Sequence, residues 1–147
     1  MNSNSNLVIL DSNFILLPFQ FKIDYFYEIR LNIEGELRFI VFKQILDELD
    51  SKRRRESKGT KFIRLLKNSL LYLNKNKDKY NIEIVEDIKK DVETTDEFLI
   101  GRALKLQNLG QNVFIATNDS ELRRKAKKLN IGTIFLRQKK YISIERA

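Results

Sequence analysis

The chain of 147 residues carries 28 Lys and Arg against 20 Asp and Glu, which gives a formal net charge of +8. It contains no cysteine and no histidine, so disulfides, thiolate metal sites, thiol nucleophiles and the commonest general base are excluded. Any chemistry must therefore use carboxylates, hydroxyls, amines or a metal ion held by oxygen ligands. The length is that of one domain, and we expect residues 1–147 to form a single one, with residues 1–6 as a polar tail.

The first six residues lack the basic and apolar regions of a signal peptide. No apolar run in the sequence approaches the length of a membrane span. We therefore expect a soluble, cytoplasmic protein with no membrane partner.

Short apolar runs, rich in β-branched and aromatic residues, alternate with segments in which apolar residues recur at helical spacing. In chain order, strands are expected over residues 7–10, 37–42, 82–85, 113–116 and 133–136. Helices are expected over residues 24–32, from 45 into the basic run 52–55, and over 62–74, 95–109 and 119–129. We expect residues 14–21 to pack on the sheet as a broken first turn, because Pro18 interrupts a helix there. This alternation predicts an α/β fold, a three-layer α/β/α domain with a central five-stranded parallel sheet.

Two of the expected strands end in the same way, with small polar residues and an aspartate before a helix. Asp11 follows the first strand and Asp119 follows the fourth. Ligands of open α/β sheets bind beyond the carboxyl ends of the strands, where the strand order reverses. If strands one and four are neighbours at that point, Asp11 and Asp119 meet in one crevice. The competing interpretation is that each aspartate only caps the helix that follows it.

Two further helices offer carboxylates to the same crevice. Asp96 precedes apolar residues at positions three, four and seven further on, so it shares the core-facing stripe of its helix. A carboxylate there is costly unless it is paired or binds a cation. Capping is the alternative, because Thr94 and Glu97 fit a capping box. In the earlier helix the pattern leaves open which of three acids takes part: Asp47, Glu48 or Asp50.

Carboxylates that converge without histidine repel one another unless a cation lies among them. Oxygen ligands alone favour Mg²⁺ or Mn²⁺ over zinc. Such an ion activates water and neutralises the charge that grows on a phosphoryl group during in-line displacement. The acidic candidates therefore indicate hydrolysis of a phosphodiester.

The positive charge is concentrated in one stretch. Residues 51–79 carry eleven basic and two acidic side chains, whereas residues 1–50 carry four and eight and residues 80–147 carry thirteen and ten. Such a block is typical of proteins that bind a polyanion, and a solvated helix surface is the plainer alternative. The side chains expected to hold the phosphates of such a polyanion are Lys52, Arg53, Arg54, Arg55, Lys58 and Lys61. The helix after Asp119 offers either a second phosphate surface or ordinary solvated charge: Arg123, Arg124, Lys127 and Lys128.

Four segments together resemble the PIN-domain nucleases, in the order in which that family has them. They are Asp11-Ser12-Asn13, Ile45-Leu-Asp-Glu-Leu49, Thr95-Asp-Glu-Phe-Leu-Ile-Gly-Arg-Ala103 and Thr117-Asn-Asp119. Two more segments are similar to the archaeal relatives of the small-subunit processome PIN endonuclease: Phe14-Ile-Leu-Leu-Pro-Phe-Gln-Phe-Lys22 and Leu136-Arg-Gln-Lys-Lys-Tyr141. The resemblance implies a five-stranded parallel sheet and a Mg²⁺- or Mn²⁺-dependent endoribonuclease that acts on single-stranded RNA. It also implies ribosomal RNA precursor as substrate, and a homodimer.

The resemblance selects Glu48 from the three acids that the pattern leaves open. Carried over position by position, it implies that the catalytic and metal-binding residues are Asp11, Glu48, Asp96 and Asp119. It implies that Asn13 and Thr117 support the site by orienting a carboxylate or a bound water. Two rival functions stay open, namely a toxin with the same chemistry and an antitoxin partner, and a non-cleaving RNA-binding scaffold in ribosome assembly.

Overall fold

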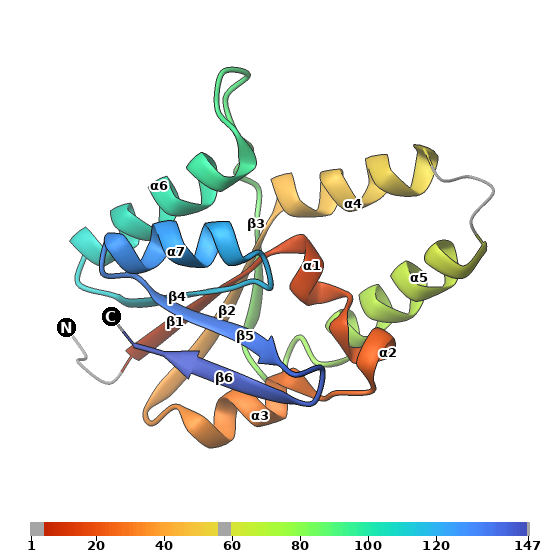
Figure 1. Ribbon diagram of the computed structural model, residues 1–147, viewed down its shortest axis with the longest axis horizontal. Helices are drawn as coiled ribbons and strands as arrows, with labels where there is room; N and C mark the ends of the chain where they lie inside the picture. The colour runs from red at the N-terminus through yellow and green to blue at the C-terminus, as the bar shows by residue number, and fades with distance from the viewer. Residues whose placement is uncertain (1–4, 56–59, 147) are drawn as a thin grey trace.

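The computed structural model describes residues 5–55 and 60–146. Its strands are β1 (Ser5–Leu10), β2 (Glu36–Phe42), β3 (Ile82–Val85), β4 (Asn112–Ala116), β5 (Gly132–Arg137) and β6 (Tyr141–Glu145). Its helices are α1 (Ser12–Ile15), α2 (Leu17–Phe21), α3 (Tyr25–Asn32), α4 (Lys43–Arg55), α5 (Thr60–Lys75), α6 (Thr95–Asn108) and α7 (Ser120–Lys128). Helices α6 and α7 lie on one side of the sheet and α3 lies on the other (Figure 1). No helix within the described ranges is long and apolar enough to cross a bilayer.

The sheet has the order β3-β2-β1-β4-β5-β6, with β1 and β4 as neighbours in the middle. The first five strands in chain order run parallel, and β6 pairs antiparallel with β5. From β1 the chain moves to β2 and β3 on one side, and afterwards to β4 and β5 on the other. The strand order therefore reverses between β1 and β4, and this reversal places the carboxyl ends of those two strands at the ligand-binding position of an open α/β sheet.

The predicted α/β/α fold is confirmed, with three differences in detail. Strand β6 extends the sheet to six strands, where the sequence pattern predicts five. The segment predicted as a broken turn is divided into the two short helices α1 and α2, and Pro18 lies in the first turn of α2, where its missing N–H costs no hydrogen bond. Strand β1 begins at Ser5, so the last two residues of the expected polar tail belong to the sheet.

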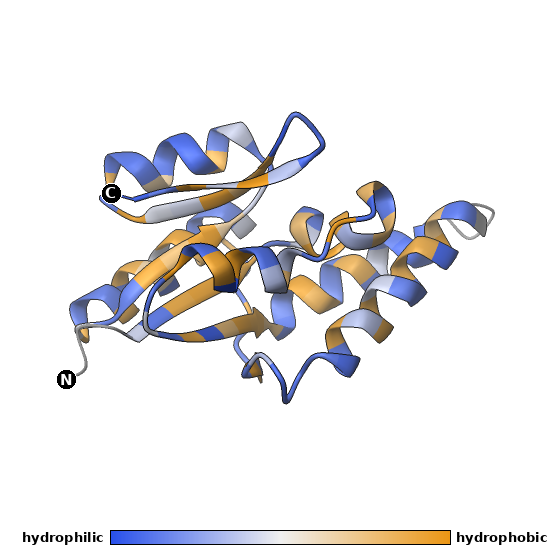
Figure 2. Cartoon of the chain, turned by 90° about the horizontal axis from the view of Figure 1, so that it is seen from below, coloured by the Kyte–Doolittle hydropathy of each residue, from blue (hydrophilic) through white to orange (hydrophobic). Residues whose placement is uncertain are grey.

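The core is built around β1, whose residues Leu7 to Leu10 are at most 1% exposed. Burial on both faces is what a run of apolar residues in a central parallel strand predicts. The strands in the middle of the molecule are accordingly hydrophobic, whereas α7 is largely hydrophilic (Figure 2). Helices α4 and α5 lie to one side of the sheet, α4 in contact with β2 and α1, and α5 in contact with α2 and α4 (Figure 1).

Candidate active site

Asp11 is the buried centre of the candidate site. Its backbone N–H donates to the carbonyl oxygen of Ala116 at 3.0 Å, which extends the pairing of β1 and β4 by one residue. Its side chain is held by three donors: the N–H of Ser12 to Oδ1 at 2.8 Å, and the Thr117 hydroxyl and Asn13 amide to Oδ2 at 2.7 and 3.1 Å. The residue is 6% exposed. Asp11 is therefore fixed in one orientation at the strand reversal.

A second layer of hydrogen bonds ties three strand ends together. The Oγ1 of Thr117 accepts from the N–H of Asp119 at 3.0 Å, and the Oδ1 of Asn13 accepts from the N–H of Asn118 at 2.9 Å. The Oδ1 of Asn118 accepts in turn from the N–H of Leu136 on β5 at 2.8 Å. Asn13 and Thr117 thus have the contacts expected of residues that orient a carboxylate.

Glu48 approaches the site from α4. Its Oε2 accepts from the Thr95 hydroxyl at 2.6 Å and from the Gln44 amide at 2.9 Å. The other two acids of this helix pair with cations of the same helix, since Asp47 pairs with Lys43 and Asp50 pairs with two arginines. Glu48 is therefore the acid of α4 that contacts the first turn of α6.

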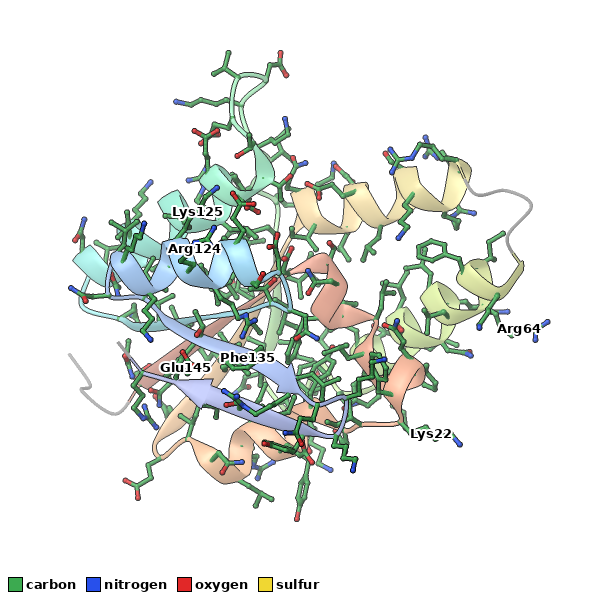
Figure 3. All side chains as sticks on the ribbon, in the orientation of Figure 1. Lys22, Arg64, Arg124, Lys125, Phe135 and Glu145 are labelled. Carbon is green, nitrogen blue, oxygen red and sulfur yellow. The ribbon has the colours of Figure 1, made fainter. Side chains whose placement is uncertain are left out.

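Asp96 lies in that first turn of α6, and capping does not use its side chain. The capping box is formed by Thr94 and Glu97, as the alternative interpretation expects. The Asp96 side chain is 26% exposed, and its Oδ2 is 3.9 Å from the Nζ of Lys125 on α7 (Figure 3). Thr94 and Glu97 therefore cap the helix, while Asp96 of the same turn is left as a candidate site residue.

Asp119 is exposed and caps α7. Its Oδ1 accepts from the N–H of Glu121 at 2.9 Å and from that of Leu122 at 3.3 Å. Asp11 also caps, because its Oδ1 accepts the N–H of Ser12 at the start of α1. Both aspartates therefore cap a helix, and each cap also places a carboxylate at the end of β1 or β4.

The electrostatics link these carboxylates to one another. Burial raises the pKa of Asp11, the hydrogen bonds from Thr117 and Ser12 oppose that rise, and the charges of Asp96 and Glu48 add to it. Partial burial also raises the pKa of Asp96, as does the charge of Asp119, whereas Lys125 lowers it. Asp11 is repelled by Asp96 and Glu48, and Asp96 is repelled by Asp119. These four predicted acids are called the acidic cluster below.

The acidic cluster fits a hard divalent cation in its chemistry. All of its ligand atoms are carboxylate oxygens, and a cation would relieve the repulsion that raises the pKa of Asp11 and of Asp96. Within residues 5–55 and 60–146, however, no three acidic side chains are gathered closely enough to hold an ion together. The acids that would bind an ion are thus neighbours in the fold, and in the described structure they stand too far apart to hold one ion together.

A cavity of about 430 Å³ adjoins the acidic cluster along α4. Its lining residues are Ser12, Gln44, Asp47, Glu48, Leu49, Ser51, Lys52 and Arg55. Glu48 belongs to both the cluster and the cavity wall, while Lys52 and Arg55 bring positive charge to the far part. The cavity therefore joins an acidic centre to a cationic surface.

The predicted RNA-binding residues differ in their surroundings in the structure. Lys52 and Arg55 line the cavity, and Lys61 is exposed on α5. Arg53 and Arg54 pair with Asp50 at 2.7 and 2.6 Å, while Lys58 lies outside the described residues.

The second candidate phosphate surface, on α7, is partly engaged within the protein. The Arg123 guanidinium lies 3.8 Å from the centre of the Phe135 ring, and Lys127 pairs with Glu145 at 3.9 Å. Arg124 and Lys128 are exposed. Two of the four candidate phosphate-binding cations of α7 therefore have partners of their own on the neighbouring strands.

Sequence reasoning missed three side chains of the site. Gln44 precedes Glu48 by one helical turn, a spacing that identifies it in retrospect. Thr95 stands beside Asp96 in the chain and reaches Glu48 through its hydroxyl. Lys125 carries no short-range signal, because only the packing of α7 against α6 brings it to Asp96.

The fold and the site define a three-layer α/β domain with an acidic crevice where the strand order of a mostly parallel sheet reverses. A family model described as a PIN like domain matches residues 8–139, and the chain belongs to this family. The chain is 31% identical over 140 residues to ribonuclease VapC4 of Methanocaldococcus jannaschii, a match that covers 93% of this chain and 95% of that protein.

Solved structures share the fold. The structure of the PIN domain endonuclease Utp24 superposes with a TM-score of 0.68 at 22% identity and covers 96% of this chain and 92% of that one. A domain of a functionally unknown protein from Methanocaldococcus jannaschii superposes with a TM-score of 0.60 at 14% identity, covering 89% and 91%. These likenesses support the assigned architecture.

Proposed function

We propose that this protein is a Mg²⁺- or Mn²⁺-dependent endoribonuclease that hydrolyses phosphodiester bonds of single-stranded RNA. The observation that carries the proposal is the acidic cluster at the strand reversal, where Asp11 is buried and repelled by Glu48 and Asp96. Membership of the PIN-like family and the likeness to a relative named a ribonuclease support the same activity. We propose that residues 1–147 act as one domain in the cytoplasm, where an RNA substrate is found.

In the mechanism, the four acids Asp11, Glu48, Asp96 and Asp119 would hold the metal. When bound, the metal supplies Lewis-acid activation of water and of the phosphoryl group. Thr117 and Asn13 keep the Asp11 carboxylate in one orientation, and Thr95 and Gln44 do the same for Glu48. Water adds to phosphorus and the 3′ oxygen leaves, which gives 5′-phosphate and 3′-hydroxyl ends. Lys52 and Arg55 would contact the flanking phosphates.

The experiment that tests this proposal compares cleavage of labelled single-stranded RNA by the wild type, Asp96→Asn and Asp91→Asn. Each protein is assayed with Mn²⁺, with Mg²⁺ and with EDTA. We expect the wild type and Asp91→Asn, an exposed acid away from the site, to cleave with either metal and to stop with EDTA. Asp96→Asn should bind RNA and not cleave it. Cleavage that persists in EDTA would overturn the metal mechanism.

For the natural substrate, we propose ribosomal RNA precursor, supported by the segments at residues 14–22 and 136–141 that resemble processing enzymes. A toxin with an antitoxin partner is the second candidate, supported by the 31% identity to ribonuclease VapC4. Expression of the wild type and of Asp96→Asn in a growing host distinguishes them. Growth arrest by the wild type alone favours the toxin, and accumulation of unprocessed ribosomal RNA with Asp96→Asn favours processing.

A non-cleaving RNA-binding scaffold is the third candidate. Tight RNA binding by the wild type without cleavage under either metal would favour it. We also propose a homodimer, which sedimentation of the wild type at micromolar concentration tests. A single monomer species at every concentration would contradict that proposal.

A further inference from the structure

A second groove, separate from the acidic cluster, lies between α2 and α5. It encloses about 940 Å³ and is lined by Phe19, Gln20, Lys61, Phe62, Arg64, Leu65 and Asn68. Phe19 is 49% exposed, although a phenylalanine on a short helix that packs against a longer one would ordinarily be covered. Two cations and two amides accompany the aromatic rings, and none of the lining residues that the structure describes is acidic.

One lysine connects this groove to the cavity beside the acidic cluster. Lys52 lines the cavity that contains Glu48, and its Nζ lies 4.8 Å from the centre of the Phe62 ring. Phe62 lines the groove. The two hollows are therefore adjacent, and a path leads from Glu48 along α4 past Lys52 to the rings and cations of α5.

The end of this path that α5 forms is positively charged. Helix α5 carries Lys61, Arg64, Lys67 and Lys75 and no acidic residue. The side chains of Arg64 and Lys22 extend into solvent on the same side of the molecule (Figure 3). An extended polyanion fits this surface, because its phosphates can be neutralised at several points along the path.

The combination of an exposed ring, cations and amides is typical of surfaces that bind single-stranded nucleic acid. A base stacks on the ring, the cations hold the neighbouring phosphates, and the amides can bond to base edges. A paired strand would present its bases to its complement and leave Phe19 without a stacking partner. The groove therefore fits unpaired RNA better than a duplex.

We propose that single-stranded RNA runs from the acidic cluster along α4 into the groove between α2 and α5, where an unpaired base stacks on Phe19 and Lys61 and Arg64 hold phosphates. This assigns the nucleotides on one side of the cleaved bond to the groove, and it rests on the proposed ribonuclease function. It also adds to the predicted RNA-binding block, which already includes Lys61 of α5, an aromatic ring that the charge pattern alone does not identify.

The test measures binding of a fluorescent single-stranded oligoribonucleotide in EDTA, so that no cleavage is needed. We expect Phe19→Ala to weaken binding by about 5- to 150-fold, the range given by stacking of one base. Tyr27→Ala is the matched control, because Tyr27 is 52% exposed on α3, outside the groove. Lys61→Gln should weaken binding and lower its salt dependence, whereas Lys105→Gln on α6 should change neither.

The contact itself can be trapped with an oligonucleotide that contains 4-thiouridine. We expect irradiation to cross-link the wild type at the peptide that contains Phe19, and not the Phe19→Ala variant. A thermal unfolding curve for each variant excludes misfolding as the cause of weak binding. RNA binding by Phe19→Ala and Lys61→Gln equal to that of the wild type would overturn the proposal.

Cleavage assays separate this inference from the proposed function. If the wild type cleaves nothing and Phe19→Ala binds RNA more weakly than the wild type, the groove proposal stands and the nuclease proposal fails. If the wild type cleaves and Phe19→Ala matches its kcat/KM on short and long substrates, the groove proposal alone fails. A synthetic acidic amphipathic peptide that requires Phe19 for binding, with RNA binding unchanged, would assign the groove to a protein partner and overturn the RNA path.

Discussion

The hydroxyl of Thr117 donates to the Oδ2 of Asp11 at 2.7 Å and joins the carboxyl ends of β1 and β4 across 106 positions of sequence. The same oxygen of Thr117 accepts the N–H of Asp119. One fully buried hydroxyl thus connects two of the four acids that we propose as metal ligands. The position of Asp11 therefore depends on a residue of another strand.

Replacing Thr117 by valine tests this connection. The variant keeps the shape of the side chain and removes the hydrogen bonds of the hydroxyl with Asp11, Asp119 and Asn13. The bond to Asp11 is made to a carboxylate. We expect a loss of about 1–3 kcal/mol in the free energy of unfolding and a fall of at least about tenfold in RNA cleavage. Thr133→Val, a buried threonine near the start of β5, is the control for stability, and it should retain cleavage. Full activity in Thr117→Val would show that Asp11 needs no orientation.

The sequence predicted the site as far as local pattern reaches. Apolar runs that end in Asp11 and Asp119 identified the two strand ends, and the parallel α/β rule brought them together. The pattern did not choose between capping and binding, because each aspartate does cap a helix while standing in the crevice. It also did not choose among the three acids of α4, since that choice depends on the Thr95 hydroxyl, which only tertiary packing brings to Glu48.

Strand β6 shows a different limit of prediction from the sequence pattern. Its turn places Gln138 and Lys139 at positive φ, 54° and 58°, the conformation in which hairpins favour Asn and Gly. Neither residue signals a turn, so the sequence pattern does not predict whether residues 137–147 join the sheet. The hairpin forms because β5 offers an unpaired edge and Ile142 buries itself against the core.

The raised pKa of Asp96 predicts how stability depends on pH. Because the folded state holds this proton more tightly than the unfolded chain, stability falls as pH rises from the ordinary value of 3.8 through the raised pKa, and it stays lower at neutral pH. Asp96→Asn removes the cost, so its Tm without metal should exceed that of the wild type at pH 7. The difference should vanish near about pH 3, where the carboxyl is protonated in both states.

The control for this measurement is Asp91→Asn, which changes an exposed acid. Its Tm should follow that of the wild type across the same pH range. A Tm for Asp96→Asn below that of the wild type at pH 7 would indicate that the contact with Lys125 outweighs burial and repulsion.

Metal binding should reverse the order of the Tm values of the wild type and Asp96→Asn. A cation that binds only the folded state adds about 2.7 kcal/mol of stability at a hundred times its dissociation constant. We expect Mn²⁺ to raise the Tm of the wild type, to raise that of Asp96→Asn less, and EDTA to remove both effects. Equal shifts in the two proteins would remove Asp96 from the set of metal ligands.

Alanine substitutions at two glycines should change the free energy of unfolding in opposite directions. At Gly132, the first residue of β5, an added Cβ would lie 2.5 Å from the Cδ1 of Phe114, a ring that is 1% exposed and paired with Gly132 across the sheet. The ring has no free space to enter, so Gly132→Ala should destabilise the fold by about 1–3 kcal/mol. At the exposed Gly101 in α6 nothing lies within 4 Å of the added atom, and Gly101→Ala should stabilise the helix by about 0.5–1 kcal/mol. Urea unfolding of both variants measures the two changes, and a shift of the same sign in both would show that the register of β4 and β5 is not the constraint.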